Sequence, residues 1–252
     1  MDGFSSSVTP LIENGFKITK TAQTVSDLLL DYTALASAPR IMTGAGVGDI
    51  LAKFCCLTDW KISHLLFGEP YCFDAATLMH TALDECVSSL RSIQSGGREG
   101  IRALMNALLT SGFAMVLAGS SRPASGAEHH MSHYLEMDYL KRGEKIPLHG
   151  VKVGLGTMIS LHLYHKLNEF DFEKKESVLA EAEKLPPVSF VRDALLSFGC
   201  PVRFSELGVS AETVRAMFFE AWKIRDRFTV LTMYNKNGWM KKTEEELMEL
   251  YY

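Results

Sequence analysis

Three of the chain's eight histidines lie close together, at His129, His130 and His133. His129 and His133 stand four positions apart, so on a helix both side chains project from the same face. Neutral imidazole rings held side by side in this way suit a divalent metal such as zinc. Two ligands do not complete a metal site, so we searched the rest of the chain for a third.

Asp49 and His149 occur in similar local settings. Each follows small or turn-forming residues and opens an apolar run with helical periodicity. One carboxylate and two imidazoles would leave coordination positions open for a substrate, which is typical of catalytic metal sites. Simpler interpretations exist for each residue. Asp49 could pair with Lys53 one turn later, and His129 and His149 could be hydrogen-bonded interior or helix-end residues.

Composition limits the class of protein. The 252 residues are 47% hydrophobic and 22% charged, which is ordinary for a globular protein with a substantial core. A net charge of −4 without a basic run argues against nucleic acid as a partner. The sequence shows neither a signal peptide nor a long uncharged membrane segment. Five cysteines without zinc-ribbon spacing indicate reduced thiols, so we expect a cytoplasmic protein.

The hydrophobic periodicity predicts an all-α helical bundle with a short N-terminal β-hairpin. Asn14-Gly15 between two alternating runs is the hairpin signal. Helical periodicity begins at Thr24, and a break follows at Pro39. Further helices are predicted from Asp49 to about residue 67, then over residues 73–93, 98–117 and to about 140 through the histidines, and again from His149, followed by charged helices.

Two glycine patterns imitate nucleotide-binding loops. Residues 44–49 read Gly-Ala-Gly-Val-Gly-Asp, and residues 153–157 read Val-Gly-Leu-Gly-Thr. Neither follows a predicted strand or lies within a βαβ unit, so we interpret neither as a dinucleotide site. The second pattern lies inside a helical run, where glycines indicate close packing between helices.

Three segments carry a family resemblance. Residues 46–53 (GVGDILAK), 121–133 (SRPASGAEHHMSH) and 148–157 (LHGVKVGLGT) resemble the sn-glycerol-1-phosphate dehydrogenase family, within the superfamily of iron-type alcohol dehydrogenases, glycerol dehydrogenase and dehydroquinate synthase. The likeness is clear to about residue 165. It implies the helical C-terminal domain of the dehydroquinate synthase-like fold: residues 1–22 as a β remnant of the nucleotide-binding domain, and residues 23–252 as the metal- and substrate-binding domain.

The resemblance also implies roles for individual residues. The opening Met-Asp-Gly-Phe-Ser-Ser matches a family motif, Ser-x-Asp-Gly-x-x-Ser, without its first residue. Composition alone would make this segment a disordered terminus. His133 is expected to orient the substrate or relay its proton, with a hydrogen bond to the metal's surroundings as the alternative. His130 is interpreted as structural, and Arg122 as a weak candidate for binding a phosphate. The implied set is Asp49, His129 and His149 for the metal, Asp49 and His133 for catalysis, Asp2, Asp49 and His133 for the substrate, and Ser6 for the cofactor.

The implied activity is NAD(P)-linked interconversion of dihydroxyacetone phosphate and sn-glycerol 1-phosphate, a step of phospholipid biosynthesis. The implied metal is Zn²⁺, with Ni²⁺ or Fe²⁺ accepted by the same ligands. Apart from the remnant in residues 1–22, the family's nucleotide-binding domain is missing from this chain, so we expect a truncated form. Such a form would be inactive unless a separately encoded nucleotide-binding chain completes it, and it would tend to form homo-oligomers. The alternative is a non-catalytic helical domain that keeps a metal for stability or partner binding.

Overall fold

A computed structural model describes residues 8–13 and 16–252. Strands β1 (Val8–Glu13) and β2 (Phe16–Thr21) form an antiparallel hairpin in which Val8 faces Thr21 and Glu13 faces Phe16. The predicted hairpin is therefore present, although its turn residues lie outside the described part. The rest of the described chain is helical, which confirms the predicted all-α class.

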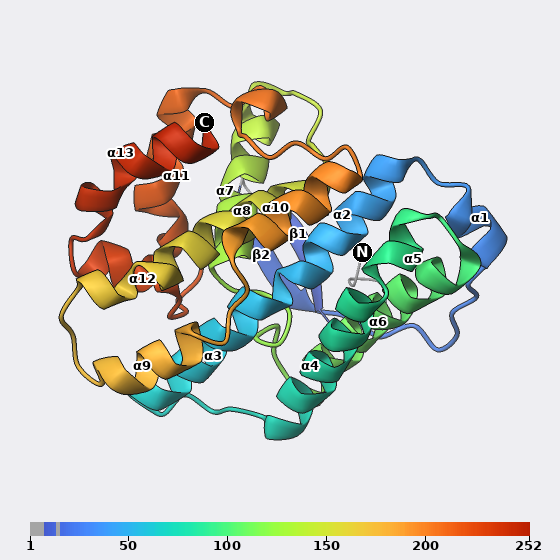
Figure 1. The fold of residues 1–252 in the computed structure, drawn as a ribbon, viewed down its shortest axis with the longest axis horizontal. Coiled ribbons are helices and arrows are strands. Elements are labelled where there is room, and N and C mark those ends of the chain that lie inside the picture. The colour runs from blue at the N-terminus through green and yellow to red at the C-terminus, as the bar shows by residue number, and fades with distance from the viewer. Residues whose placement is uncertain (1–7, 14–15) are drawn as a thin grey trace.

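The helices follow one another on short connections (Figure 1). Their bounds are α1 Tyr32–Ala36, α2 Arg40–Leu51, α3 Lys53–Phe67, α4 Phe73–Ser88, α5 Leu90–Gln94, α6 Arg98–Ala118, α7 Ala127–Arg142, α8 His149–His165, α9 Lys175–Ala182, α10 Val188–Ser197, α11 Ala211–Glu220, α12 Val230–Lys236 and α13 Met240–Tyr251. Short 3-10 turns occur at Leu167–Glu169, Ser205–Leu207 and Ala221–Lys223.

Two predicted helix starts were wrong. Residues 22–31, all of them described, contain no helix, and α1 begins only at Tyr32 after the Asp31 side chain accepts the Thr33 and Ala34 amides. Val25, Leu28 and Leu29 in this segment are 53%, 43% and 95% exposed, so most of its apolar residues gain little packing that would stabilise a short helix. In contrast, α2 begins at Arg40, and Asp49 lies in its last turn. The glycines of α2 are tolerated because they pack closely against neighbouring helices.

Helix α8 occupies the centre of the fold. It is apolar on nearly all sides and buried along almost its whole length. Helices α2 and α10 run beside it, and α7 packs against another face (Figure 1). This central position places the N-terminus of α8 beside the C-terminal turn of α2 and the first turn of α7. Three helix ends that are distant in sequence therefore meet at one place.

The approach of α2 to α8 depends on glycine. A Cβ atom built on Gly150 would lie 1.7 Å from the Ala45 carbonyl oxygen, and one on Gly48 would lie 2.4 Å from the Gly150 oxygen. A Cβ on Gly156 would lie 2.7 Å from the Glu128 oxygen in α7. The glycines thus allow the three helix backbones to pack in near contact, and two of them directly flank Asp49 and His149.

Two stretches of helix, Arg40–Phe67 and Arg98–Ala118, are long and apolar enough to cross a membrane by length and composition alone. In the fold, 72% of the apolar window of the first stretch and 50% of that of the second are buried against the rest of the protein. Burial within the bundle accounts for most of the apolar character of the first stretch, as expected of a core helix.

Candidate metal centre

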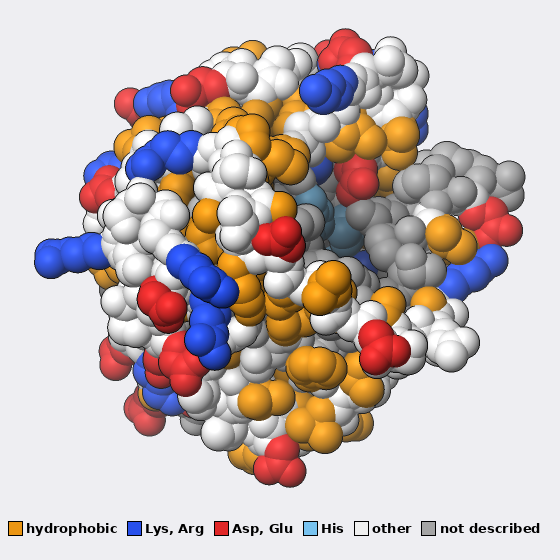
Figure 2. Space-filling model, turned by 90° about the vertical axis from the view of Figure 1, so that its right-hand side faces the viewer, with side chains coloured by type: hydrophobic (Ala, Val, Ile, Leu, Met, Phe, Trp, Pro, Cys, Tyr) orange, Lys and Arg blue, Asp and Glu red, His pale blue; other side chains and the backbone are white. Residues whose placement is uncertain are grey.

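Side chains from three helices converge at one point. Asp49 comes from the last turn of α2, His129 from the first turn of α7, and His149 is the first residue of α8. One carboxylate oxygen and one nitrogen from each imidazole lie within 4.8 Å of one another. Figure 2 shows histidine side chains at the bottom of a recess in one face of the molecule. The fold thus brings together the three residues that the sequence singled out.

The spacing of the three groups fits a metal ion. Asp49 Oδ1 lies 3.5 Å from His129 Nε2 and 3.6 Å from His149 Nε2. In a tetrahedral zinc site with bonds of about 2.1 Å, neighbouring ligand atoms lie about 3.4 Å apart. Both carboxylate oxygens of Asp49 are buried without a hydrogen-bond partner among the described residues. A buried oxygen that faces two imidazole nitrogens and lacks a donor is the arrangement that a divalent cation would satisfy.

The charges around Asp49 favour its ionised form. Lys53 is fully buried one turn away, and its Nζ lies 3.6 Å from Asp49 Oδ2. Burial alone raises the pKa of the Asp49 carboxyl, but the Lys53 ammonium and the His129 ring outweigh it and hold the pKa well below its usual range. The Asp49–Lys53 pair considered from the sequence therefore exists. It uses one carboxylate oxygen and leaves the other directed at the histidines.

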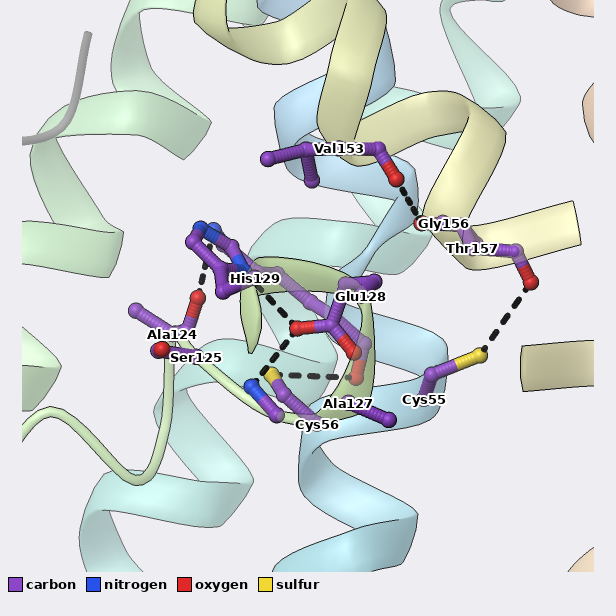
Figure 3. A network of polar contacts seen from close by, with 12 residues as sticks. Cys55, Cys56, Ala124, Ser125, Ala127, Glu128, His129, Val153, Gly156 and Thr157 are labelled. Atoms are coloured by element: carbon purple, nitrogen blue, oxygen red, sulfur yellow. Dashed lines mark hydrogen bonds and ion pairs between the residues drawn. The ribbon is translucent and has the colours of Figure 1, made fainter. Parts of the chain in front are cut away.

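Glu128 fixes the orientation of His129 (Figure 3). Its Oε1 lies 2.8 Å from His129 Nδ1 and accepts the Gly126 amide at 2.6 Å. A carboxylate on Nδ1 keeps the proton there and directs the lone pair of Nε2 toward Asp49. Burial lowers the pKa of His129, but the nearby carboxylates of Asp49 and Glu128 raise it above its usual value. A metal bound at Nε2 would therefore have to displace a proton.

We expect Glu128→Gln to weaken metal binding about 10- to 100-fold, because such carboxylates orient a ligand and increase its basicity. The measurement is a competition titration of the purified chain with Zn²⁺ and a chelating dye. Glu144→Gln is the matched control, since Glu144 is exposed and pairs with Arg142. Equal zinc affinity in the Glu128 and Glu144 variants would contradict this role for Glu128.

A second buried carboxylate, Asp59, joins the site to the rest of the fold. It accepts the Ala127 amide at 2.8 Å, the Val230 amide at 2.7 Å and the Tyr164 hydroxyl at 2.5 Å. These bonds satisfy backbone donors at the N-termini of α7 and α12. Burial, and then repulsion from the Glu128 carboxylate, raises the pKa of Asp59 to about 7. Ionisation of Asp59 therefore opposes folding.

This raised pKa predicts a pH dependence of stability. Between about pH 4 and about pH 7 the folded state binds a proton on Asp59 that the unfolded state has released, so the unfolding free energy falls as pH rises. The loss is at most about 4 kcal/mol and levels off above about pH 7. Urea unfolding across this range should show a steeper decline for wild type than for Asp59→Asn. Parallel curves for the two proteins would exclude this account.

His133 lies on the same face of α7, one turn after His129. Its ring centroid is 6.0 Å from those of His129 and His149, and its Nε2 lies 3.4 Å from the Arg225 guanidinium. Its Nδ1 lies 3.6 Å from Glu136. His133 thus borders the three converging groups without joining them. His130 is fully buried, and burial followed by the charges of Arg227 and Arg225 lowers its pKa, so its ring is neutral.

Other predicted site residues have different outcomes. Asp2 and Ser6 lie outside the described residues. Arg122 is buried and donates to both Glu69 oxygens and, at 2.8 Å, to the Phe228 carbonyl. It is therefore committed to holding the fold rather than presented to a ligand.

Sequence reasoning did not identify Glu128, Asp59, Arg225 or Arg227 as neighbours of the site. The signals for Glu128 were its position directly before His129 and its place in the segment 121–133 that carries the resemblance. For the two arginines, the signal was the Arg-Asp-Arg sequence at 225–227 within a charged segment. Nothing local connects the Arg-Asp-Arg sequence to His133, which Arg225 contacts across a separation of 92 positions.

Comparison with known proteins identifies clear relatives, although no protein-family profile matches the sequence. Glycerol-1-phosphate dehydrogenase (NAD(P)+) of Bacillus licheniformis is 41% identical over 94% of the chain, and that of Bacillus subtilis is 39% identical over 94%. The Pyrococcus horikoshii enzyme is 33% identical over 99%. The chain spans about 60% of the first of these relatives, 62% of the second and 64% of the third.

Solved structures share the fold at low identity. A 1,3-propanediol oxidoreductase aligns with the whole chain at a TM-score of 0.61 and 16% identity, over 62% of its own length. Sulfoacetaldehyde reductase from Bifidobacterium kashiwanohense aligns with 94% of the chain at 0.57 and 13%, over 61% of its own length. These structures have the iron-type alcohol dehydrogenase fold, whose C-terminal domain is helical. By sequence and fold, the chain is a homologue of the glycerol-1-phosphate dehydrogenases that corresponds to about three fifths of their length.

Proposed function

We propose that the chain is the metal- and substrate-binding part of an NAD(P)-linked oxidoreductase that interconverts dihydroxyacetone phosphate and sn-glycerol 1-phosphate. The convergence of Asp49, His129 and His149 at one buried point carries this proposal. The names of the relatives support the substrate and the cofactor. With this activity, the protein would act in the cytoplasm and take part in phospholipid synthesis.

Asp49, His129 and His149 would hold a divalent cation, with Zn²⁺ as the first choice and Ni²⁺ or Fe²⁺ as alternatives. Such a cation supplies Lewis-acid polarisation of a substrate oxygen. His133 borders these residues and is well placed to orient the substrate and to exchange a proton with its C2 hydroxyl group. Glu128 keeps His129 in the required tautomer, and Lys53 keeps Asp49 ionised.

The dinucleotide requires a further domain. In residues 8–13 and 16–252, the strands form one antiparallel hairpin, which offers no βαβ unit to hold a pyrophosphate. We propose that a nucleotide-binding domain, in the same longer protein or in a separate chain, places the nicotinamide over the recess that contains the histidines. Hydride transfer needs close positioning of the cofactor, so the described domain alone should turn over very slowly.

The relevant experiment is a reconstitution. The purified chain is loaded with Zn²⁺ and mixed with NADH and dihydroxyacetone phosphate, with and without the nucleotide-binding domain of a relative such as the Bacillus licheniformis enzyme. Consumption of NADH that depends on both proteins would support the proposal. Stoichiometric metal binding with no consumption of NADH in any mixture would favour a non-catalytic metal-binding domain instead.

Exposed apolar side chains on one helix support the expectation of self-association. Phe113, Val116 and Leu117 of α6 are 58%, 43% and 54% exposed and are spaced to share one helix face. An apolar face of this kind is typical of a surface that is covered in an assembly. We propose that it takes part in homo-oligomer formation.

A further inference from the structure

A second group of polar side chains adjoins His133, away from the metal ligands. Arg225 and Arg227 lie in the segment between the 3-10 turn Ala221–Lys223 and α12, and both reach toward the loop that precedes α7. Arg122 is paired with Glu69 and donates to the Phe228 carbonyl, so it anchors the segment that carries Arg225 and Arg227. The two arginines are thus held by the fold and do not extend freely into solvent.

The donors of this group converge on two hydroxyl groups. Arg225 lies 3.2 Å from Ser125 Oγ and 3.4 Å from Ser121 Oγ, and Arg227 lies 3.1 Å from Ser121 Oγ. Arg227 also donates to the Ser125 carbonyl at 2.8 Å. The second nitrogen of Arg225 lies 3.4 Å from His133 Nε2. Two guanidinium groups, two hydroxyls and one imidazole therefore surround a small region one helical turn from His129.

The local charge favours an anion in this region. Burial, followed by the charges of Arg122 and Arg225, lowers the pKa of the Arg227 guanidinium to about 9, and Glu69 only partly opposes this. Two guanidinium groups that share a serine hydroxyl repel each other in a half-buried setting. An anion with several acceptor oxygens would neutralise both guanidinium groups and accept paired hydrogen bonds from each.

We propose that Arg225, Arg227, Ser121 and Ser125 form the subsite for the phosphate group of the substrate, a phosphomonoester of a three-carbon polyol or ketone. The assignment rests on the proposed function. It places the phosphate end of the substrate at the two arginines and the reacting C2 carbon near the metal ligands. In sn-glycerol 1-phosphate, one carbon and the ester oxygen separate the C2 centre from the phosphorus atom. His133 lies in the same way between the metal ligands and the arginines, so the reacting carbon and the phosphate can occupy the two places together.

A surface cavity gives access to the two arginines of the proposed subsite. A cavity of about 490 Å³ is lined by Arg225 and Arg227, together with Lys223 and Lys236, and by two acidic residues, Glu69 and Asp226. Of these acidic residues, Glu69 is already paired with Arg122. The histidines do not line this cavity, so it reaches the arginines from another direction. Anions can therefore reach Arg225 and Arg227 from this side without passing the metal ligands, whereas Ser121 and Ser125 do not line the cavity.

Binding to the zinc-loaded chain tests the subsite without turnover. Phosphorus NMR and calorimetry are used with inorganic phosphate, sn-glycerol 1-phosphate and glycerol as three separate probes. We expect Arg227→Met to weaken binding of both phosphate-containing probes about 10- to 100-fold, because it removes charge-assisted hydrogen bonds to an anion. Glycerol binding and zinc stoichiometry should not change. Arg192→Met, at an exposed pair with Asp193, is the control and should bind all three probes like wild type.

Arg227→Lys provides a second variant in case the methionine substitution impairs folding, which thermal melting would reveal. It keeps the charge and loses the planar fork, so its affinity for glycerol 1-phosphate should fall between wild type and Arg227→Met. Equal affinity of wild type, both Arg227 variants and Arg192→Met for the phosphate probes would overturn the subsite. Reconstituted chain that binds glycerol 1-phosphate through Arg227 but does not oxidise it would contradict the proposed activity and leave the subsite standing.

Discussion

Replacement of His129 by alanine is expected to abolish stoichiometric metal binding. His129 Nε2 and Asp49 Oδ1 face each other at 3.5 Å, and a site of three protein ligands cannot lose one nitrogen and retain its affinity. Because structural metal sites contribute on the order of 10 kcal/mol over about four ligands, loss of one should weaken zinc binding on the order of 100-fold or more. Metal analysis after dialysis, followed by a zinc competition titration, measures the effect.

His130→Ala is the matched control for this substitution. His130 is the next residue of α7 and is fully buried, but it is not one of the three converging residues. Its removal should reduce stability while leaving one zinc ion per chain. Zinc should also raise the melting temperature of wild type and of His130→Ala, because a ligand that binds only the folded state stabilises it. It should not do so in His129→Ala. If His129→Ala keeps its zinc and His130→Ala loses it, the ligand assignment is wrong.

The helical class of the fold was predictable from the sequence because it depends on local periodicity. The runs over residues 73–93 and 98–117 show the 3.6-residue period over several turns, and α4, α5 and α6 occupy these residues. The same reasoning failed before Tyr32, where Val25 and Leu29 imitate a helix but are left exposed. Whether an apolar residue finds a packing partner depends on the tertiary fold, which local periodicity does not contain.

The site was predictable only in part. Spacing on one helix paired His129 with His133, similar local settings added Asp49 and His149 as candidates, and the family resemblance then selected Asp49, His129 and His149 as the metal ligands. The surrounding groups were not accessible in this way. Glu128 and Asp59 act through hydrogen bonds to Gly126 and Ala127 whose geometry depends on how α3 and α7 pack. Arg225 reaches His133 across a sequence separation that no local pattern bridges.

The glycine pattern before Asp49 shows why contacts between distant helices cannot be predicted from local sequence. From the sequence, Asp49 is predicted to lie after small or turn-forming residues, at the start of a helix, and glycine does disfavour helices. In the structure these residues are helical, and the glycines allow α2 to approach α8. Glycine lowers the intrinsic stability of the helix, but it allows two helix backbones to pack in close contact. Local sequence does not reveal this tertiary contact. The position of Asp49 relative to His149 depends on this contact.

Gly150→Ala should therefore disrupt the fold and the site together. The added methyl group would lie 1.7 Å from the Ala45 carbonyl oxygen, which belongs to backbone and cannot rotate away. The helices must separate, and overpacking of this kind costs about 3 kcal/mol or more when rigid atoms collide. Because Gly150 directly follows His149, the separation should also move His149 away from Asp49. We expect a lower unfolding free energy in urea and weaker zinc binding in the same variant.

Gly97→Ala separates this effect from the general consequence of replacing a glycine. A Cβ atom on Gly97 would have its nearest neighbour at 3.5 Å, an ordinary contact, and Gly97 lies at the start of α6, far from the metal ligands in sequence. Its unfolding free energy should change by less than about 1 kcal/mol, and its zinc affinity should equal that of wild type. If Gly150→Ala matches Gly97→Ala in both measurements, the close approach of α2 and α8 does not position the ligands. If Gly150→Ala loses stability but binds zinc normally, the glycine serves the fold alone, and the geometry of Asp49 and His149 must be maintained by α7.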